Sequence, residues 1–365
     1  MKTKPVFLVA TIVAAMSFTA CQKEISNSSV TPGISMAPVS SERGILKFKD
    51  KETMNKTIQE LQQKSIVDVT QWEKNLNFTS QFSVFNEVTN QENLHEEKCI
   101  KSGEKSVEHS DYYFTIIKEN ILKEVTYEDG TTSYDYNIFD ASVVNVINKE
   151  GLVVINNVLH QYADNKLKTT PYNGNASIIA IKAASKTNEH VTVTEYSLVR
   201  DSKNPTTASS YYWSLNTNWK TAGKLRARMH TDGYSNSSGY SSNTIVWQVN
   251  IDFQKKNFWG NWVYNDFTCC ALTGNWQYRY GVSRNSTPFT CNTYYRMNPF
   301  STTPITYTYS NYWPSINKLT VKLEPNGTWF ASSGGYDTFC DAVNVYTYSF
   351  SANLCAISGA LTLSR

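Results

Sequence analysis

The sequence predicts an α+β N-terminal domain followed by an all-β C-terminal domain, an antiparallel sandwich or a barrel-like variant of it. Its 365 residues are enough for two domains of ordinary size. Apolar residues with helical spacing occur in the first half, whereas apolar and polar residues alternate as in strands through most of the second half. Of the 48 aromatic residues, 31 lie within residues 211–365, and aromatic side chains favour strands.

Composition and charge indicate a folded chain without a strongly basic surface. Hydrophobic residues make up 40% of the sequence and charged residues 18%, which is typical of a folding chain rather than a disordered one. The formal net charge is only +3, from 34 Lys and Arg against 31 Asp and Glu. Because nucleic-acid binding needs a broad positive field, we expect no nucleic-acid partner.

Residues 1–20 have the organisation of a signal peptide. Lys2 and Lys4 precede an apolar run over residues 6–16, and small or weakly polar residues lead to Ala20. As a helix, residues 6–20 would reach about 22 Å, short of the roughly 30 Å hydrocarbon core. The next residue, Cys21, stands where a bacterial lipoprotein is cleaved and acylated, so we predict Cys21 as the lipid attachment that joins the protein to a membrane. The alternative is ordinary secretion, with Cys21 incidental.

Residues 21–43 are expected to be the lipidated cysteine and a flexible tether, because residues 22–43 are rich in Ser and hold no apolar periodicity. The sequence Gln22-Lys23-Glu24 directly after Cys21 resembles the short signal that exports Bacteroidetes lipoproteins to the outer face of the outer membrane. We therefore expect an outer-membrane lipoprotein that faces the cell exterior.

Residues 44–200 are expected to form the α+β domain. After a short strand over 44–48, Asp50 can cap a helix with apolar residues spaced as in Met54 and Ile58. A second helix follows around Trp72, and Asn77 stands where a left-handed stop is needed. Residues 152–155 and 158–162 flank Asn156-Asn157, and Asp164-Asn165 supplies a second turn, so a β-meander is predicted there.

Residues 207–365 are expected to form the aromatic-rich sandwich, with the boundary in the Ser-, Thr- and Asn-rich stretch near 201–210. Residues 245–253 alternate between apolar and polar-leaning side chains, which predicts a strand with one buried face and one face in water. Similar alternation occurs around Ala227, Tyr278, Tyr307 and Val321. A transmembrane barrel is the alternative, but these runs are shorter than the roughly 9 to 11 residues that its strands need.

Several segments resemble an uncharacterised family of Bacteroidetes surface lipoproteins with a domain of unknown function. They touch about half of the chain. None is a catalytic motif, so the resemblance implies a location and an architecture but no reaction. The segments are Cys21-Gln22-Lys23-Glu24, residues 44–48 through 72–78, residues 148–155 and residues 255–262.

We find no metalloprotease, nucleophile-elbow, dinucleotide, phosphate-loop or complete calcium-loop motif. No catalytic residue, cofactor or metal site is therefore predicted. His95 and Cys99 are four residues apart and could share a helix face, with His109 as a distant third ligand. A solvated acidic helix with an unrelated cysteine is the favoured interpretation.

Export through the periplasm would permit disulfides. The candidate cysteines of the β domain are Cys269, Cys270, Cys291, Cys340 and Cys355. Cys269 and Cys270 are adjacent and should point to opposite faces of a strand. The alternative is that several of the five are small buried apolar residues.

The aromatic excess is the remaining functional signal. Trp259, beside Gly260, and Tyr312-Trp313, before Pro314, are expected in turns, where exposed rings indicate binding. Trp247 and Trp262 are interpreted as core residues. Aromatic rings beside Asn and Ser side chains are typical of sugar-binding sites on β-sandwich modules. Glycan binding at Trp259, Tyr312 and Trp313 is therefore the more specific of the two hypotheses for these aromatics. The alternative is that core and sheet packing explains the aromatics.

The functional hypothesis is thus a lipid-anchored surface lipoprotein that binds an extracellular ligand, with a glycan favoured over a partner surface protein. One alternative is a structural or assembly lipoprotein with no small ligand. Another is a surface hydrolase, which would need two carboxylates converging in a cleft. The carboxylates that the β domain offers are Asp232, Asp252, Asp266, Glu324, Asp337 and Asp341, with Asp201 at its edge.

Overall fold

The computed structural model describes residues 39–103, 109–198, 219–235, 244–265, 270–279, 282–285, 295–296, 305–313, 317–322, 327–328, 338–341, 344–354 and 357–364, some of them by backbone alone. The predicted signal peptide, Cys21, most of the tether and the predicted boundary at 201–210 lie outside the described residues. Within the described ranges, no helix combines the length and the apolar character needed to cross a membrane.

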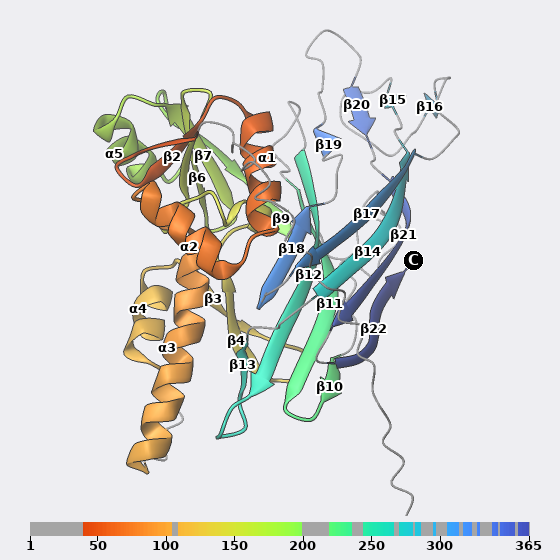
Figure 1. Ribbon diagram of the computed structural model, residues 1–365. Coiled ribbons are helices and arrows are strands. Elements are labelled where there is room, and N and C mark those ends of the chain that lie inside the picture. Colours follow the sequence, from red (N-terminus) through yellow and green to blue (C-terminus); the bar gives the residue numbers. More distant parts are fainter. Residues whose placement is uncertain are drawn as a thin grey trace, which may run out of the picture. The chain divides into compact units, whose positions relative to one another are not determined.

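A mixed sheet with strand order β1-β2-β5-β6-β7-β8 organises the first half (Figure 1). Strands β2 and β5 run parallel, and the other neighbours are antiparallel. The strands are β1 (Ser40–Glu42), β2 (Ile45–Phe48), β5 (Leu152–Ile155), β6 (Val158–Ala163), β7 (Lys166–Pro171) and β8 (Thr192–Glu195). Strand β1 lies within the segment that was expected to be tether.

The predicted meander is confirmed by β5, β6 and β7. Asn156 and Asn157 have φ values of 51° and 59°, and Asp164 and Asn165 have φ values of 49° and 58°. Asparagine and aspartate tolerate this left-handed region better than most residues do, and paired positive φ values produce the tight hairpin turn. The turn residues therefore set the register of this sheet.

The described residues form five α-helices and one 3-10 helix. These are α1 (Lys51–Gln62), α2 (Ile66–Asn75), α3 (Gln81–Ser102), α4 (Asp111–Lys118), α5 (Asn175–Ala183) and η1 (Ala141–Val143). Asp50 caps α1 by accepting a hydrogen bond from the Thr53 backbone N–H at 2.7 Å, as the sequence predicts. Asn77, with φ 47°, follows α2 as the predicted left-handed stop.

The second half consists of strands in every described segment. A seven-stranded sheet contains β10 (Lys220–Ala222), β11 (Leu225–Ser235), β12 (Thr244–Lys256), β13 (Trp262–Tyr264), β18 (Lys318–Lys322), β19 (Gly327–Thr328) and β9 (Ser197–Leu198). A four-stranded sheet has the order β17 (Ile305–Trp313), β14 (Cys270–Arg279), β21 (Asn344–Leu354) and β22 (Ile357–Ser364). A small sheet holds β15 (Val282–Asn285), β16 (Tyr295–Arg296) and β20 (Thr338–Asp341), and β3 (Leu122–Thr126) pairs with β4 (Thr132–Tyr136).

Two buried clusters show how these elements pack. One contains side chains of both larger sheets of the second half, such as Ile251 from β12 and Leu272 from β14. The other extends through the helices and the β3–β4 hairpin and includes Val246 and Tyr264 from the second half. The fold is therefore α+β with extensive antiparallel sheet, and the seven-stranded sheet contributes to both clusters.

The expectation that one face of residues 245–253 lies in water is wrong. Val249, Ile251 and Phe253 are buried as expected, but Gln248, Asn250 and Asp252 on the other face are also at most 3% exposed. Groups of both halves contact the polar face: Gln248 Nε2 donates to the Phe139 carbonyl of the first half at 3.1 Å, and Asn250 Nδ2 donates to Asp232 of the second half at 2.8 Å. Alternation alone indicates a strand, but not what covers its polar face.

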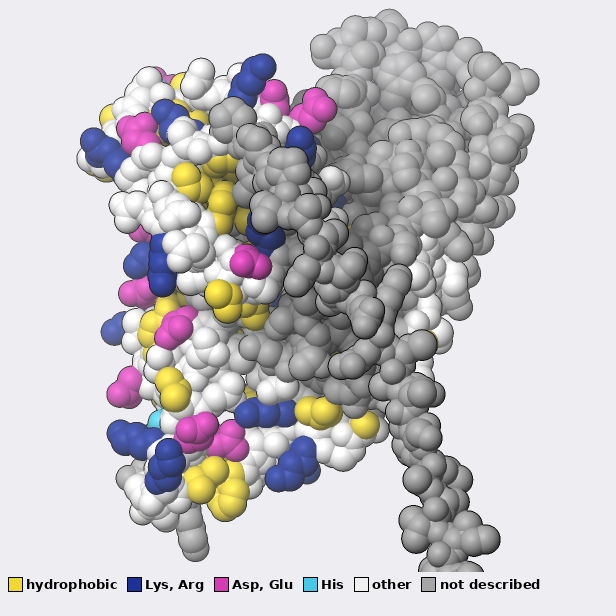
Figure 2. Space-filling view, viewed as in Figure 1, with side chains coloured by type: hydrophobic (Ala, Val, Ile, Leu, Met, Phe, Trp, Pro, Cys, Tyr) yellow, Lys and Arg dark blue, Asp and Glu magenta, His cyan; other side chains and the backbone are white. Residues whose placement is uncertain are grey.

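Charged side chains are mixed on the face of the molecule in Figure 2. Lys and Arg alternate there with Asp and Glu over the described surface. This pattern agrees with the small net charge of the sequence.

Candidate functional site

A cleft of about 390 Å³ is lined by residues of α3, of the β3–β4 turn and of the β12–β13 hairpin. Its volume is within the range of small-molecule sites. We call it the Trp259 cleft. Its lining residues are Glu92, His95, Glu96, His109, Gly130, Thr131, Thr132, Asn257, Trp259, Gly260, Asn261, Trp262 and Val263.

The hairpin turn that carries Trp259 is rigidly hydrogen-bonded. The Asn257 N–H donates to the Asn261 carbonyl at 2.8 Å, and the Asn261 N–H donates to Asn257 Oδ1 at 2.8 Å. Gly260 closes the turn with φ 92°, a conformation that side chains rarely adopt. The Phe258 N–H donates to Glu96 Oε1 at 2.5 Å, which fixes the turn against α3.

Trp259 itself is half-buried and lines the cleft. Its indole Nε1 is shielded from solvent and has no hydrogen-bond partner among the described residues. A buried donor without a partner costs on the order of 1 to 3 kcal/mol, so such groups call for an explanation. The turn placement predicted for Trp259 is confirmed, and its ring is less exposed than a free binding platform would be.

Glu92 of α3 and His109, which precedes α4, form a hydrogen-bonded pair in the lining of the cleft. Glu92 Oε2 lies 2.6 Å from His109 Nδ1, and Oε1 accepts hydrogen bonds from the Ser110 N–H at 2.8 Å and hydroxyl at 2.7 Å. Although burial opposes it, the hydrogen bonds from His109 and Ser110 lower the pKa of Glu92. The His109 ring stacks on Tyr113 with centroids 3.9 Å apart. A carboxylate therefore holds this imidazole in one orientation.

A buried arginine lies beside the cleft and contacts two of its lining residues, Thr131 and Trp262. Arg226, 1% exposed, lies between two indoles, with Cζ 3.9 Å from the Trp219 ring centroid and 4.4 Å from that of Trp262. Its guanidinium donates to Asp129 at 2.6 Å and to Thr131 Oγ1 at 2.9 Å. Trp262, interpreted as core, is half-buried and forms a wall shared by the cleft and this stack.

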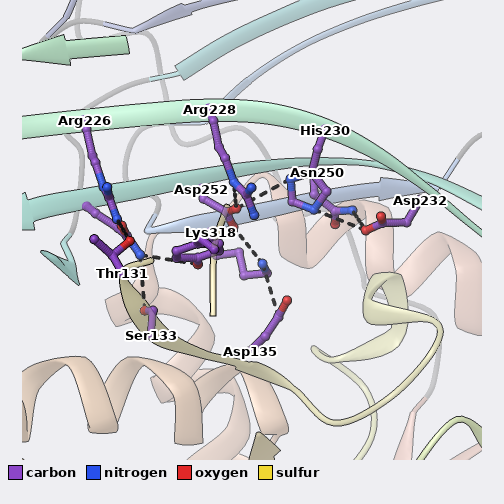
Figure 3. A network of polar contacts seen from close by, with 12 residues as sticks. Thr131, Ser133, Asp135, Arg226, Arg228, His230, Asp232, Asn250, Asp252 and Lys318 are labelled. Atoms are coloured by element: carbon purple, nitrogen blue, oxygen red, sulfur yellow. Dashed lines mark hydrogen bonds and ion pairs between the residues drawn. The ribbon is translucent and has the colours of Figure 1, made fainter. Parts of the chain in front are cut away.

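A network of buried charges lies next to this arginine, outside the cleft lining (Figure 3). Asp252 Oδ1 is 2.7 Å from Lys318 Nζ, and Asp252 Oδ2 is 3.0 Å from Arg228 Nε. Lys318 Nζ also contacts Asp135 at 3.2 Å, so it joins carboxylates from both halves of the chain. His230 extends the network, with Nε2 3.2 Å from Asp232.

The network shifts the titration of its members. Burial alone would raise the pKa of Asp252, but Lys318, His230 and Arg228 hold it well below its usual range. Burial alone would lower the pKa of Lys318, but Asp135 and Asp252 raise it. These side chains are therefore ionised in the folded protein, and their charges are balanced within the network.

Of the carboxylates named for a hydrolase, the two whose side chains are described, Asp232 and Asp252, do not line the cleft. Asp232 and Asp252 belong to the buried network, where Asp232 Oδ2 accepts from Asn250 Nδ2 at 2.8 Å. Asp341 is described by its backbone in β20. Asp201, Asp266, Glu324 and Asp337 lie outside the described residues.

Tyr312 and Trp313 were expected in a turn, but they end strand β17. Their backbones pair with Ala271 and Cys270 of β14, so the strand continues to the residue before Pro314. Their side chains, and that of Trp247, lie outside the described residues.

The cysteines are placed as follows. Cys270 is buried and carries a free thiol, and burial raises its pKa to about 12. Cys340 lies in β20, and Cys269, Cys291 and Cys355 are outside the described residues. Cys99 is buried, with its Sγ 3.6 Å from His95 Nε2 on the same face of α3, as the spacing predicts. No group of three or more metal-ligating side chains is present in the described part of the chain.

Sequence reasoning singled out three residues of the cleft lining, Trp259, His95 and His109, but not Glu92 or Glu96. Glu92 and Glu96 come from α3, far from Trp259 in sequence. A sequence signal existed for Ser110, the partner of Glu92, because Ser110-Asp111 is a typical helix start, and the Ser110 hydroxyl caps the Tyr113 N–H at 3.2 Å. The pairing of that cap with α3 depends on tertiary packing.

Comparisons with known proteins give one neighbour. No family model matches the chain, and no curated protein matches it. Among solved structures, it is similar to a DUF4848 family protein from Bacteroides thetaiotaomicron, with 11% identity and a TM-score of 0.28 over 90% of this chain and 100% of that one. This likeness is too low to support an argument on family, fold or function.

Proposed function

We propose that this protein is a lipid-anchored lipoprotein, displayed on the cell exterior, whose Trp259 cleft binds a glycan. The observation that carries the proposal is the ring of Trp259, which is half-buried, lines a 390 Å³ cleft and stands on a hydrogen-bonded turn. A sugar could stack its apolar face on the accessible part of this ring.

The rest of the lining supports the same ligand class. Amide, hydroxyl and imidazole groups of Asn257, Thr132 and His95 lie around the ring. Such a mixture of an aromatic surface with a few polar groups is typical of sites that orient small polar ligands. We further propose that the seven- and four-stranded sheets form the sandwich that presents this hairpin, with Cys21 and the tether joining it to the membrane.

The experiment is a glycan array probed with the mature chain from residue 22, which keeps every described residue. We compare wild type with Trp259→Ala and Trp259→Phe. Alanine removes the ring and the donor, whereas phenylalanine keeps a ring and removes only the donor. We expect alanine to abolish binding and phenylalanine to weaken it. An unchanged signal from Trp259→Ala would remove the cleft from the proposal.

The matched control is Trp72→Phe, which changes an indole on α2 that packs against Phe78 with centroids 6.2 Å apart. Trp72 does not line the cleft. We expect its array signals to equal those of wild type. A loss of signal in this control would mean that general destabilisation, not the cleft, explains the Trp259 variants.

The second candidate function, a surface hydrolase, is favoured by the Glu92–His109 pair. An imidazole whose Nδ1 is held by a carboxylate presents Nε2 as the nitrogen that can accept a proton from water. The test is the release of new reducing ends from polysaccharides that the protein retains, compared between wild type and His109→Gln. Turnover by wild type that His109→Gln removes would favour hydrolysis, and retention without turnover would favour binding.

A further inference from the structure

We infer that the Trp259 cleft accepts several consecutive units of an uncharged oligosaccharide, and that it discriminates against acidic sugars. The inference rests on the proposed function and names its ligand class. Two independent observations carry it. One is the placement of exposed rings beside the cleft, and the other is the charge of the cleft lining.

Among the residues that the structure describes, six large hydrophobic side chains are exposed, and two of them adjoin cleft residues. Phe258 is 65% exposed, with its ring centroid 6.0 Å from that of Trp259. Phe114 is 50% exposed, with its ring centroid 6.2 Å from that of His109. Exposed phenylalanine rings gain nothing from water, but each can stack on the apolar face of a sugar ring.

The two rings come from different elements. Phe258 belongs to the β12–β13 turn, and Phe114 belongs to α4. Neither is among the residues that line the cleft, whereas their neighbours Trp259 and His109 are. A single sugar in the cleft would leave both rings in water. A chain of sugar units extending from the cleft could cover them.

The charged side chains of the lining are acidic or imidazole. Glu92 and Glu96 line the cleft, and the described residues of its lining include no lysine or arginine. The pKa of Glu92 is lowered, so this carboxylate carries its charge at neutral pH. Two cations lie just outside the described lining: Lys255 is 3.7 Å from Glu96, and Lys256 Nζ is 5.8 Å from the Trp262 ring centroid. A carboxylated or sulfated sugar would therefore meet two carboxylates within the described lining, with the cations only at its edge.

Neutral hydroxyls match the groups that remain. The lining offers amide, hydroxyl and imidazole groups, and a sugar hydroxyl can bind such groups without bringing a charge into a partly desolvated site. The same reasoning disfavours phosphorylated ligands, which need basic or helix N-terminal groups to bind them.

The experiment is isothermal titration of the mature chain from residue 22 with defined sugars. The neutral probes are cello-, manno- and malto-oligosaccharides of one to six units, and the acidic probes are oligogalacturonides of the same lengths. We expect affinity for at least one neutral series to rise with length beyond two units, and oligogalacturonides to bind at least tenfold more weakly. Phe258→Ala and Phe114→Ala should each lower affinity for the longest neutral sugar about three- to tenfold and leave the mono- and disaccharide unchanged.

The matched control is Ile179→Ala on α5, which removes a side chain that is 62% exposed and does not line the cleft. Its affinities should equal those of wild type, and all three variants should keep the wild-type melting temperature within about two degrees because exposed side chains contribute little to stability.

The outcomes separate this inference from the proposed function. Affinity that does not depend on length, or phenylalanine variants that bind like wild type, would overturn the extended site and leave glycan binding standing. Equal or tighter binding of oligogalacturonides would overturn the charge discrimination. Absence of binding by every probe, together with an empty glycan array, would overturn the proposed function and the inference with it.

Discussion

Asp252 is a carboxylate that the fold removes almost completely from water and surrounds with cations. It is 1% exposed, and Lys318, Arg228 and the Tyr264 hydroxyl all contact it within 3.1 Å. Asp252→Asn removes the charge and leaves Lys318 with only Asp135 as a carboxylate partner. Because breaking a buried pair leaves an uncompensated charge, we expect a loss of about 3 to 5 kcal/mol in the free energy of unfolding, measured by urea denaturation.

The double variant Asp252→Asn with Lys318→Met tests the reason for that loss. Removing both charges also removes the unpaired ammonium, so the double variant should be more stable than Asp252→Asn alone. A double variant that is less stable by the sum of the two single losses would show that the ion pair is not the source of the effect.

His160 predicts a pH dependence of stability. Burial, reinforced by the charge of Lys51, lowers its pKa from 6.5 to about 4, and its Nδ1 has no hydrogen-bond partner among the described residues. Between pH 6.5 and 4 the unfolded chain binds a proton that the folded chain does not, so stability falls as the pH is lowered through this window. We expect the contribution to be on the order of 2 kcal/mol, measured from urea midpoints across the window.

His160→Gln cannot take up this proton and should flatten the decline. The control is His190→Gln, because the His190 side chain is 74% exposed, and this variant should keep the wild-type slope. Equal slopes for wild type and His160→Gln would assign the pH dependence to other groups.

Individual residues also show where sequence reasoning ends. Gln248 was predicted on the face of a strand that lies in water, yet it is only 3% exposed. Gln254 on the same strand is fully buried and donates to Ser133 Oγ at 3.2 Å. Local alternation identifies a polar face, whereas its burial depends on partners more than 100 positions away in the chain. The same limit applies to Trp259, whose turn was predictable and whose opposite wall was not.

At the scale of elements, the turn before β5 depends on a glycine. Gly151 has φ 76°, and a Cβ there would lie 2.0 Å from the Tyr162 carbonyl oxygen. Gly103, at the end of α3, has nearly the same φ of 73° with nothing within 4 Å of its Cβ position. We expect Gly103→Ala to cost about 1 kcal/mol and Gly151→Ala several kcal/mol, since only the second adds a clash with backbone to the strain.

Thermal unfolding of both variants gives the measurement. Both substitutions carry the cost of the left-handed conformation, so the difference between the two melting temperatures measures the cost of the clash with β6. Similar melting temperatures for the two variants would mean that the β5–β6 contact relaxes without penalty.

Elements with strong end signals were predictable. Asp50 and Asn77 mark the start of α1 and the end of α2, and paired Asn and Asp residues mark the hairpins of the first sheet. The 22-residue helix α3 was foreseen only around His95 and Cys99, because its buried positions include Gln81, Asn86 and Thr89, which weaken the apolar periodicity. The end of β17 was missed because Pro314 gave a turn signal while Tyr312 and Trp313 still pair with β14.

At the scale of the whole molecule, the two halves are joined by polar contacts as well as apolar ones. A fragment of residues 207–365 keeps the cluster shared by β12 and β14, so we expect a β-rich circular dichroism spectrum. It loses Asp135, Phe139 and Ser133, which satisfy Lys318, Gln248 and Gln254 in the full chain. We therefore expect its melting temperature to be clearly lower than that of the full chain.

Two results would contradict this expectation in different ways. A fragment that melts at the temperature of the full chain would show that the contacts between the halves contribute little. A fragment without a folded spectrum would show that its sheets need the first half to form at all.

The shared network around Lys318 also bears on how such a chain can evolve. A recombination event that replaced residues 207–365 with those of a distant relative would separate Lys318 from Asp135 and Arg226 from Asp129 in a single step. Each separation leaves a partly exposed carboxylate of the first half, Asp135 or Asp129, without its cation, and this loss would lower the stability of such chimaeras. We therefore expect the two halves to be inherited together, with substitutions at these four positions occurring in compensating pairs.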